Sequence, residues 1–162
     1  MRRNKYWKAI VTFGGLGYSP FAPGTMGAFG ALIPALLIIH FAPYPYFWLL
    51  LLIILATVLG IIGADKLVAE WGNDPQKIVI DEATGMWISL LWVGTNWITM
   101  LAAFILFRFF DIVKPLGIRK SEELSGGIGV MTDDIIAGIY SNLILQIALI
   151  LLPDVFLTLS MK

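Results

Sequence analysis

The strongest constraint on the fold of this 162-residue chain is the apolar run at residues 47–64, which contains no charged side chain. Eighteen such residues are about the number that an α-helix needs to cross the hydrocarbon core of a bilayer. The whole chain shares this character, because 59% of its residues are hydrophobic and 14% are charged. An average soluble domain has about 25% charged residues. We therefore expect an integral membrane protein.

Three further apolar stretches accompany this run, at residues 28–42, 83–107 and 135–152. Apolar segments in a bilayer must satisfy their backbone hydrogen bonds internally, and the alternation typical of a membrane β-barrel is absent. The pattern therefore predicts an all-α, polytopic helical bundle with three to four membrane segments. No long linker divides the chain, so we expect a single domain over residues 1–162.

The topology depends on residues 83–107, which are interrupted at their centre by a Gly-Thr-Asn turn. Lys and Arg gather at residues 2–8, 66–77 and 108–120, and the positive-inside rule places all three regions in the cytoplasm. This placement requires the chain to fold back at the turn. Each arm of the hairpin would be about 16 Å long, which suits a re-entrant helical pair shielded by protein. A single crossing is the alternative.

The composition excludes several kinds of chemistry. Eleven basic and eleven acidic residues cancel, so no broad positive field exists to hold nucleic acid. The absence of cysteine excludes disulfides, thiolate nucleophiles and cysteine-bound zinc. A single histidine excludes multi-histidine metal sites. Polar chemistry must therefore rest on carboxylates, Lys, Arg, Ser, Thr and the backbone.

The first of four polar clusters is the Gly/Pro-rich segment at residues 14–27. Its glycines allow the backbone to approach a ligand closely, and successive N–H groups can bind an anion. Thr25 is expected to cap a helix that begins near Met26, which would set the positive end of that helix beside a phosphate. A plain loop leading into a helix is the alternative. The segment is not a P-loop, because no Gly-Lys-Ser/Thr ending is present.

Asp81 and Glu82 form the second cluster, at the entry to an apolar segment. The helix dipole stabilises acidic residues in a first turn, which is one explanation of the pair. Metal ligation is the other, because Mg²⁺ prefers carboxylate oxygens and water. Adjacent residues of a helix point in different directions, so we expect only one of the two to face a given metal. Gly85, one turn later, leaves room for a partner helix or a ligand.

The third cluster consists of Arg108, Asp111 and Lys114, whose spacing of three places them on one helix face. Pro115 is expected to end that helix at Lys114. One explanation is an ion-paired stripe whose long side chains reach the membrane interface. The other is that Asp111 binds a metal while Arg108 and Lys114 bind phosphate.

The fourth cluster follows the glycine-rich run at residues 126–129. Thr132 is expected to cap a helix, with Asp133 and Asp134 in its first turn. Paired carboxylates beside hydrocarbon are costly without a counter-charge. One divalent-cation site therefore explains the two acidic pairs more simply than two coincidental caps do.

These four clusters, in this order, resemble the phosphatidylglycerophosphatase A family, the Mg²⁺-dependent membrane lipid phosphatases of bacteria. The matching residues are 23–27 (PGTMG), 80–85 (IDEATG), 107–115 (FRFFDIVKP) and 126–138, which contain the second acidic pair. The chain departs from the family at Ala28, where a serine is usual, and at Gly117, where a second proline is usual. Both departures lie beside the polar core of the motifs.

The resemblance implies hydrolysis of the terminal phosphate monoester of the lipid phosphatidylglycerophosphate, which yields phosphatidylglycerol and phosphate. It implies a multi-pass protein of the bacterial cytoplasmic (inner) membrane with its active site facing the cytoplasm. A phosphate monoester needs cations around its oxygens and a positioned nucleophile. The chain has no cysteine, one histidine and no Asp-x-Asp motif. Water activated by Mg²⁺ is therefore the expected nucleophile.

Seven charged residues are the candidate catalytic residues. The five carboxylates among them are the candidate ligands of one or two Mg²⁺ ions, and we expect Asp81 or Glu82 to act together with Asp111, Asp133 and Asp134. Two cations and two residues of the first cluster are the expected substrate contacts: Arg108, Lys114, Gly24 and Thr25. The alternatives are another lipid phosphatase or phosphotransferase, a non-catalytic ion transporter, and a structural membrane subunit.

Overall fold

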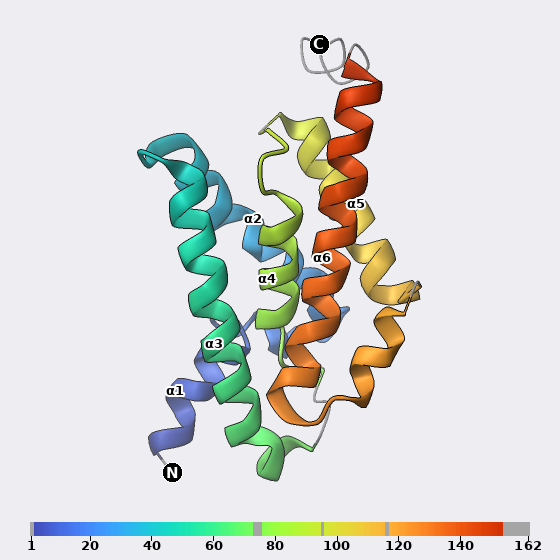
Figure 1. Ribbon diagram of the computed structural model, residues 1–162. Coiled ribbons are helices and arrows are strands. Elements are labelled where there is room, and N and C mark those ends of the chain that lie inside the picture. Colours follow the sequence, from blue (N-terminus) through green and yellow to red (C-terminus); the bar gives the residue numbers. More distant parts are fainter. Residues whose placement is uncertain (1, 73–75, 95, 116, 154–162) are drawn as a thin grey trace.

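The computed structural model describes residues 2–72, 76–94, 96–115 and 117–153 (Figure 1). Over these residues the chain is helical and contains no strand, which confirms the all-α prediction. The α-helices are α1 (Arg2–Val11), α2 (Pro23–Phe41), α3 (Pro45–Trp71), α4 (Ile80–Ser89), α5 (Trp97–Val113) and α6 (Gly126–Leu151). Two short 3-10 helices, η1 (Leu16–Tyr18) and η2 (Ile118–Glu123), lie in the connections.

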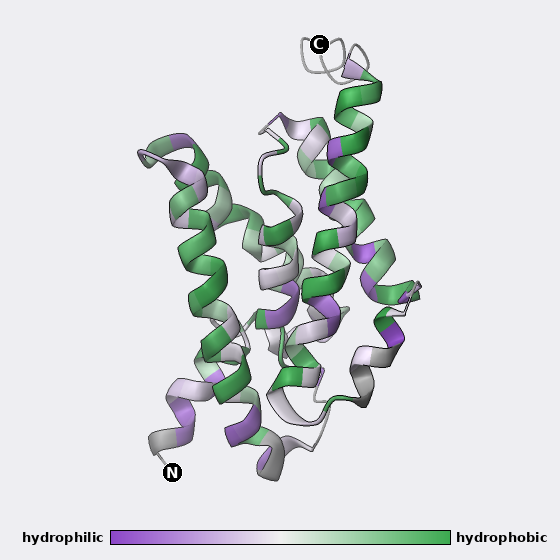
Figure 2. Cartoon of the chain, in the orientation of Figure 1, coloured by the Kyte–Doolittle hydropathy of each residue, from purple (hydrophilic) through white to green (hydrophobic). Residues whose placement is uncertain are grey.

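Three helices are long and apolar enough to cross a membrane: α2, α3 over Pro45–Leu67, and α6. They correspond to the apolar stretches predicted from the sequence, and α2 and α6 begin earlier than expected. Figure 2 shows hydrophobic residues along most of α3 and α6, whereas hydrophilic residues gather in the half of the bundle near the N-terminus. The structure is therefore a helical membrane bundle with its charge concentrated toward one end.

The chain folds back between residues 83 and 107, as predicted, although α5 with 17 residues is longer than the predicted arm. That the pair is re-entrant in the membrane stays a prediction. The apolar stretch breaks into α4 and α5, which run in opposite directions (Figure 1). Asn96 caps α5, because its side-chain oxygen accepts hydrogen bonds from the N–H groups of Ile98 at 3.1 Å and Thr99 at 2.8 Å. Thr95, at the centre of the predicted turn, lies outside the described residues. With ten residues, α4 is only about 15 Å long and ends inside the bundle.

α6 satisfies the backbone at the end of α4. The amide nitrogen of Asn142 donates to the carbonyl oxygens of Ser89 at 3.2 Å and Leu91 at 2.7 Å. Gln146 in turn donates to the side-chain oxygen of Asn142 at 2.6 Å. A helix end leaves carbonyl groups without intrahelical partners, and such groups are costly inside an apolar bundle. Asn142 therefore stabilises the point at which the hairpin turns.

We expect Asn142→Leu to lower the free energy of unfolding by about 1–3 kcal/mol, because it leaves buried carbonyl oxygens without a donor. Thermal unfolding of the detergent-solubilised protein would measure the loss. Gln146→Leu is the matched control, since Gln146 donates to Asn142 and not to the end of α4. Equal unfolding curves for the Asn142 variant and the wild type would contradict this role.

A close crossing of α4 and α6 determines where the acidic pairs lie. A Cβ added at Gly138 would lie 3.0 Å from the Cα of Gly85 and closer still to its carbonyl oxygen. A Cβ at Gly85 would meet Phe107 and the carbonyl oxygen of Asp134. Small residues let membrane helices approach this closely. The expectation that Gly85 makes room for a partner helix is confirmed, and the partner is α6.

Candidate functional site

A cavity of about 470 Å³ is formed by the start of α2, the start of α4, the end of α5 and α6. Its walls contain Gly24 and all seven charged residues predicted from the sequence: Asp81, Glu82, Arg108, Asp111, Lys114, Asp133 and Asp134. The acidic pairs come together because Asp81 precedes Gly85 by one turn and Asp134 precedes Gly138 by one turn. The Gly85–Gly138 crossing thus brings both pairs to one place.

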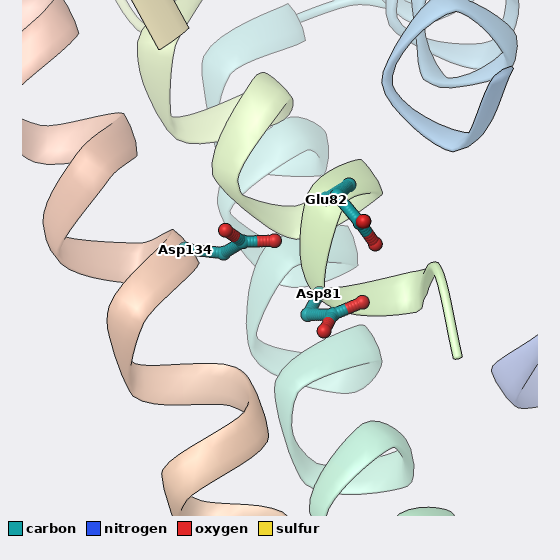
Figure 3. A group of neighbouring side chains, drawn as sticks. All are labelled: Asp81, Glu82 and Asp134. Carbon is teal, nitrogen blue, oxygen red and sulfur yellow. The ribbon is translucent and has the colours of Figure 1, made fainter. Parts of the chain in front are cut away.

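Three carboxylates form the centre of this cavity. Asp81, Glu82 and Asp134 each offer one oxygen, and the three oxygens lie within 4.8 Å of one another (Figure 3). Asp134 is only 3% exposed. One oxygen of Asp81 and one of Glu82 are buried without a hydrogen-bond partner among the described residues. Buried, unpaired carboxylate oxygens are suitable ligands for a hard divalent cation, so the donor set fits Mg²⁺.

The expectation that only one residue of the first pair faces a given metal is wrong for this group. Both Asp81 and Glu82 contribute an oxygen, because the side chains of the two residues turn toward each other and come within hydrogen-bonding reach. Burial raises the pKa of Asp81 well above its usual range, and the neighbouring Glu82 charge raises it further. Burial likewise raises the pKa of Glu82. A positive charge in the cavity would favour the ionised form of both groups.

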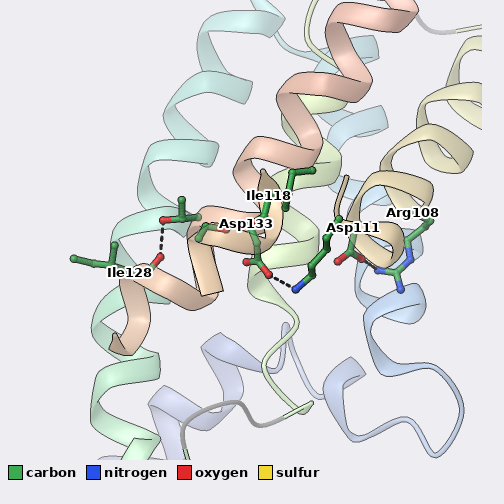
Figure 4. Close-up of polar contacts among 8 residues, drawn as sticks. Arg108, Asp111, Ile118, Ile128 and Asp133 are labelled. Carbon is green, nitrogen blue, oxygen red and sulfur yellow. Dashed lines mark hydrogen bonds and ion pairs between the residues drawn. The ribbon is translucent and has the colours of Figure 1, made fainter. Parts of the chain in front are cut away.

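Two ion pairs form the other wall of the cavity (Figure 4). Arg108 pairs with Asp111, three residues later on α5, as the spacing predicts. The ammonium group of Lys114 pairs with Asp133 of α6 at 2.6 Å. The Nε of Arg108 and one oxygen of Asp133 are buried without a hydrogen-bond partner among the described residues. Each pair therefore keeps a polar atom that is available to a ligand.

The third cluster, Arg108, Asp111 and Lys114, does not share one helix face as predicted. α5 ends at Val113, and Lys114 is its C-cap, with a left-handed backbone at φ 48°. Lys114 therefore leaves the helix face that Arg108 and Asp111 share and reaches across to α6. Asp111 and Asp133 lie beside the three-carboxylate group but are paired to cations. Their role as metal ligands stays a prediction.

The predicted helix cap at Thr25 is wrong. α2 begins at Pro23, three residues before Met26, because proline is well suited to the first position of a helix, and Ala22 is the N-cap. Thr25 does not line the cavity. Gly24 does: a Cβ at this position would meet the carboxylate of Glu82 and lie 3.2 Å from Arg108 Nη1. Glycine at this position is thus required by the close approach of α2 to the charged site.

The predicted cap at Thr132 is also wrong. α6 begins at Gly126, and the Thr132 hydroxyl donates within the helix to the carbonyl of Ile128 at 2.6 Å. The residue that satisfies the start of α6 is Asp65 of α3, which accepts a hydrogen bond from Gly127 N–H at 2.6 Å. Sequence analysis missed Asp65, since nothing local connects it to a helix that starts 61 residues later.

The early start of α6 changes where the second acidic pair lies within the helix. Asp133 and Asp134 lie in the third turn of α6, not in its first turn. The helix dipole acts mainly within the first turn and therefore does not account for these carboxylates. For Asp81 and Glu82, which do lie in the first turn of α4, the dipole contributes. A ligand that is shared by both acidic pairs remains the simplest explanation of why the Asp134 carboxylate is buried at this position.

Fold and site together define a helical membrane protein with a charged cavity. The carboxylates of this cavity suit a divalent cation, and its two cationic side chains, Arg108 and Lys114, suit an anionic group. The chain belongs to the phosphatidylglycerophosphatase A family, whose model matches residues 9–149. The resemblance found in the four clusters is thereby confirmed. Family membership makes the chain a membrane phosphatase that acts in lipid metabolism.

The relatives carry two different names. The chain is 36% identical over 144 residues to phosphatidylglycerophosphatase A of Escherichia coli, covering 87% of this chain and 82% of that protein. It is 38% identical over 126 residues to the Haemophilus influenzae protein of the same name, covering 76% of each. It is 45% identical over 155 residues to a Bacteroides thetaiotaomicron protein named "Putative phosphatidylinositol-3-phosphatase", covering 91% of this chain and 97% of that protein. No solved structure matches the chain.

Proposed function

We propose that this protein hydrolyses the terminal phosphate monoester of phosphatidylglycerophosphate in a Mg²⁺-dependent reaction and releases phosphatidylglycerol and phosphate. The observation that carries the proposal is the group of three carboxylates, the buried Asp134 and the partly buried Asp81 and Glu82, beside two cations in a cavity of an apolar bundle. Membership of the family and the names of two relatives support the substrate. We further propose that the cavity faces the cytoplasm at the bacterial inner membrane.

The residues of the cavity divide into two groups by charge. Asp81, Glu82 and Asp134 would hold Mg²⁺, which when bound supplies Lewis-acid polarisation of a phosphoryl oxygen and a more acidic water. Arg108 and Lys114 bind the phosphate oxygens and stabilise the charge that develops in the transition state. Because both cations are already held by carboxylates, their side chains need little reorganisation when the substrate arrives.

The reaction needs one proton acceptor and one proton donor. A carboxylate of the cavity takes a proton from the attacking water, whose oxygen forms a bond to phosphorus. The bond between phosphorus and the glycerol oxygen breaks, and that oxygen takes up the proton that the carboxylate received. Ile112 of α5 and Val130 of α6 also line the cavity.

A second substrate is favoured by one observation, the name of the Bacteroides relative. Phosphatidylinositol 3-phosphate also carries a phosphate monoester on a polyol that is joined by a phosphodiester to the lipid. The chemistry at phosphorus would be the same, and only the head group would differ. An ion transporter is disfavoured by membership of a phosphatase family.

Metal removal gives the direct test. With purified protein in detergent, phosphate release from phosphatidylglycerophosphate is expected with Mg²⁺ and is expected to stop with EDTA, because the three carboxylates repel one another and the phosphate without a cation. Phosphatidylinositol 3-phosphate and phosphatidic acid serve as competing substrates. Faster release from the inositol lipid would favour the second substrate. No release from any of the three by folded protein would contradict the proposal.

A further inference from the structure

A second cavity, of about 520 Å³, adjoins the first one. Pro20, Pro23 and Gln76 line both cavities, so the two share a wall. The remaining walls of the second cavity come from η1, the end of α3 and Lys77. Unlike the first cavity, it contains aromatic rings and only one carboxylate, that of Glu70. The chemistry that it suits therefore differs from that of the metal-binding group.

The charges of the second cavity favour an anion. Glu70 is already occupied, because Lys8 of α1 forms an ion pair with it and Asn4 donates to it at 3.1 Å. These contacts lower the pKa of Glu70 below its usual value, the hydrogen bond from Lys8 having the largest effect. Lys77 has no carboxylate partner among the residues that the structure describes. One positive charge is thus left for a ligand.

One aromatic ring, that of Trp71, contacts the exposed Lys77 and also the ammonium group of Lys8. The ammonium group of Lys77 lies 5.7 Å from the centre of the Trp71 ring, a cation–π contact. Tyr18 of η1 packs edge-on against Trp71, with the ring centres 6.4 Å apart. Aromatic faces and edges also pack well against the CH groups of a polyol. The cavity therefore offers a cation next to a surface for a small hydroxylated group.

The two cavities lie at different depths along the membrane-spanning helices. Trp71 is four residues beyond Leu67, where the span of α3 ends, or about 6 Å of helix. Asp134 is eight residues inside the span of α6, or about 12 Å from its start at Gly126. Asp65 of α3 contacts Gly127, so these two span ends are level. The second cavity therefore lies beyond the end of the α3 span, whereas the first lies beside the α6 span. Lipid head groups are found just past the ends of membrane-spanning segments.

We propose that the second cavity binds the part of the lipid head group that is not hydrolysed, an anionic phosphodiester bearing a short polyol. Lys77 binds the diester, the polyol packs against Trp71 and Tyr18, and the monoester reaches the carboxylate group in the first cavity. This inference rests on the proposed function. It adds a binding site for the part of the head group that stays on the lipid after hydrolysis. It makes Lys77 a specificity-determining residue.

A soluble fragment of the head group tests the site without any turnover. Glycerophosphoglycerol contains the diester and the glycerol but no monoester and no acyl chain. We expect calorimetric titration to detect its binding to the wild-type protein, and Lys77→Gln to weaken that binding about tenfold, as for the loss of one charge-assisted hydrogen bond. Lys66→Gln is the matched control, because Lys66 lies over Trp7 and outside both cavities. It is expected to bind like the wild type.

Absence of binding to the wild type, or equal binding to the wild type and Lys77→Gln, would overturn the proposal. A kinetic comparison supplies a second readout. Lys77→Gln is expected to lower kcat/KM for phosphatidylglycerophosphate about tenfold more than for phosphatidic acid, which has no diester. A protein that binds glycerophosphoglycerol through Lys77 but hydrolyses no phosphatidylglycerophosphate would contradict the proposed function and leave the assignment of the second cavity intact.

Discussion

Asp134→Asn is expected to reduce turnover of phosphatidylglycerophosphate by about a thousandfold while the protein stays folded. The side chain is 3% exposed and belongs to the three-carboxylate group with Asp81 and Glu82. Asn has nearly the same shape, so the packing is kept, but the group loses one of the charges that attract the cation. A metal ion supplies several kcal/mol of transition-state stabilisation, and about 4 kcal/mol corresponds to a factor of a thousand.

Two measurements separate a chemical effect from a folding defect. Phosphate release at saturating Mg²⁺ measures turnover, and thermal unfolding with EDTA measures stability without metal. Because the buried carboxylates repel one another, the variant is expected to be at least as stable as the wild type in EDTA. Asp65→Asn is the control: Asp65 lies outside the cavity, and Asn can still accept the hydrogen bond from Gly127. Wild-type turnover by Asp134→Asn would remove Asp134 from the site.

Gly138→Ala is expected to reduce both stability and turnover. The added Cβ would lie 3.0 Å from the Cα of Gly85 and nearer to its carbonyl oxygen, so α4 and α6 must move apart. Overpacking of this kind costs about 1–3 kcal/mol of unfolding free energy. The same movement separates Asp134 from Asp81, and a displacement of about 1 Å can lower turnover about a hundredfold.

Leu143→Ala is the control for this substitution, because it changes side-chain size on the same helix at a position exposed on the outside of the bundle. It is expected to leave turnover close to that of the wild type. Thermal unfolding and phosphate release are measured for both variants, at low and at high Mg²⁺. If Gly138→Ala kept wild-type turnover, the close crossing would not be needed to assemble the carboxylates.

Much of the fold could be predicted from local sequence. The uncharged run at residues 47–64 lies within α3, and the Gly-Thr-Asn interruption separates α4 from α5. These predictions succeeded because burial of apolar side chains and backbone hydrogen bonding within one segment are local properties. The residues at which the helices begin were harder to predict. Thr25 and Thr132 carry suitable capping side chains, yet the helices begin at Pro23 and Gly126.

The start of α6 could not be predicted from local sequence, because it depends on tertiary contacts with α3. A glycine-rich run usually indicates a loop, since glycine lowers the stability of a helix. In this protein, Gly127 lies within α6, and glycine is needed there because a Cβ would collide with the backbone of Ile61 on α3. Asp65 supplies the hydrogen-bond acceptor for Gly127 N–H from the same helix. Neither contact can be recognised from residues 126–138 alone.

The seven charged residues that line the cavity could be identified from local sequence, because carboxylates and cations in an apolar chain are costly and stand out. How these residues are grouped depends on helix packing. The crossing at Gly85 and Gly138 unites Asp81, Glu82 and Asp134, which come from segments about fifty residues apart. It also pairs Lys114 with Asp133 across two helices. Such distances depend on how closely the helices pack, and close packing is a property of pairs of surfaces rather than of any one segment.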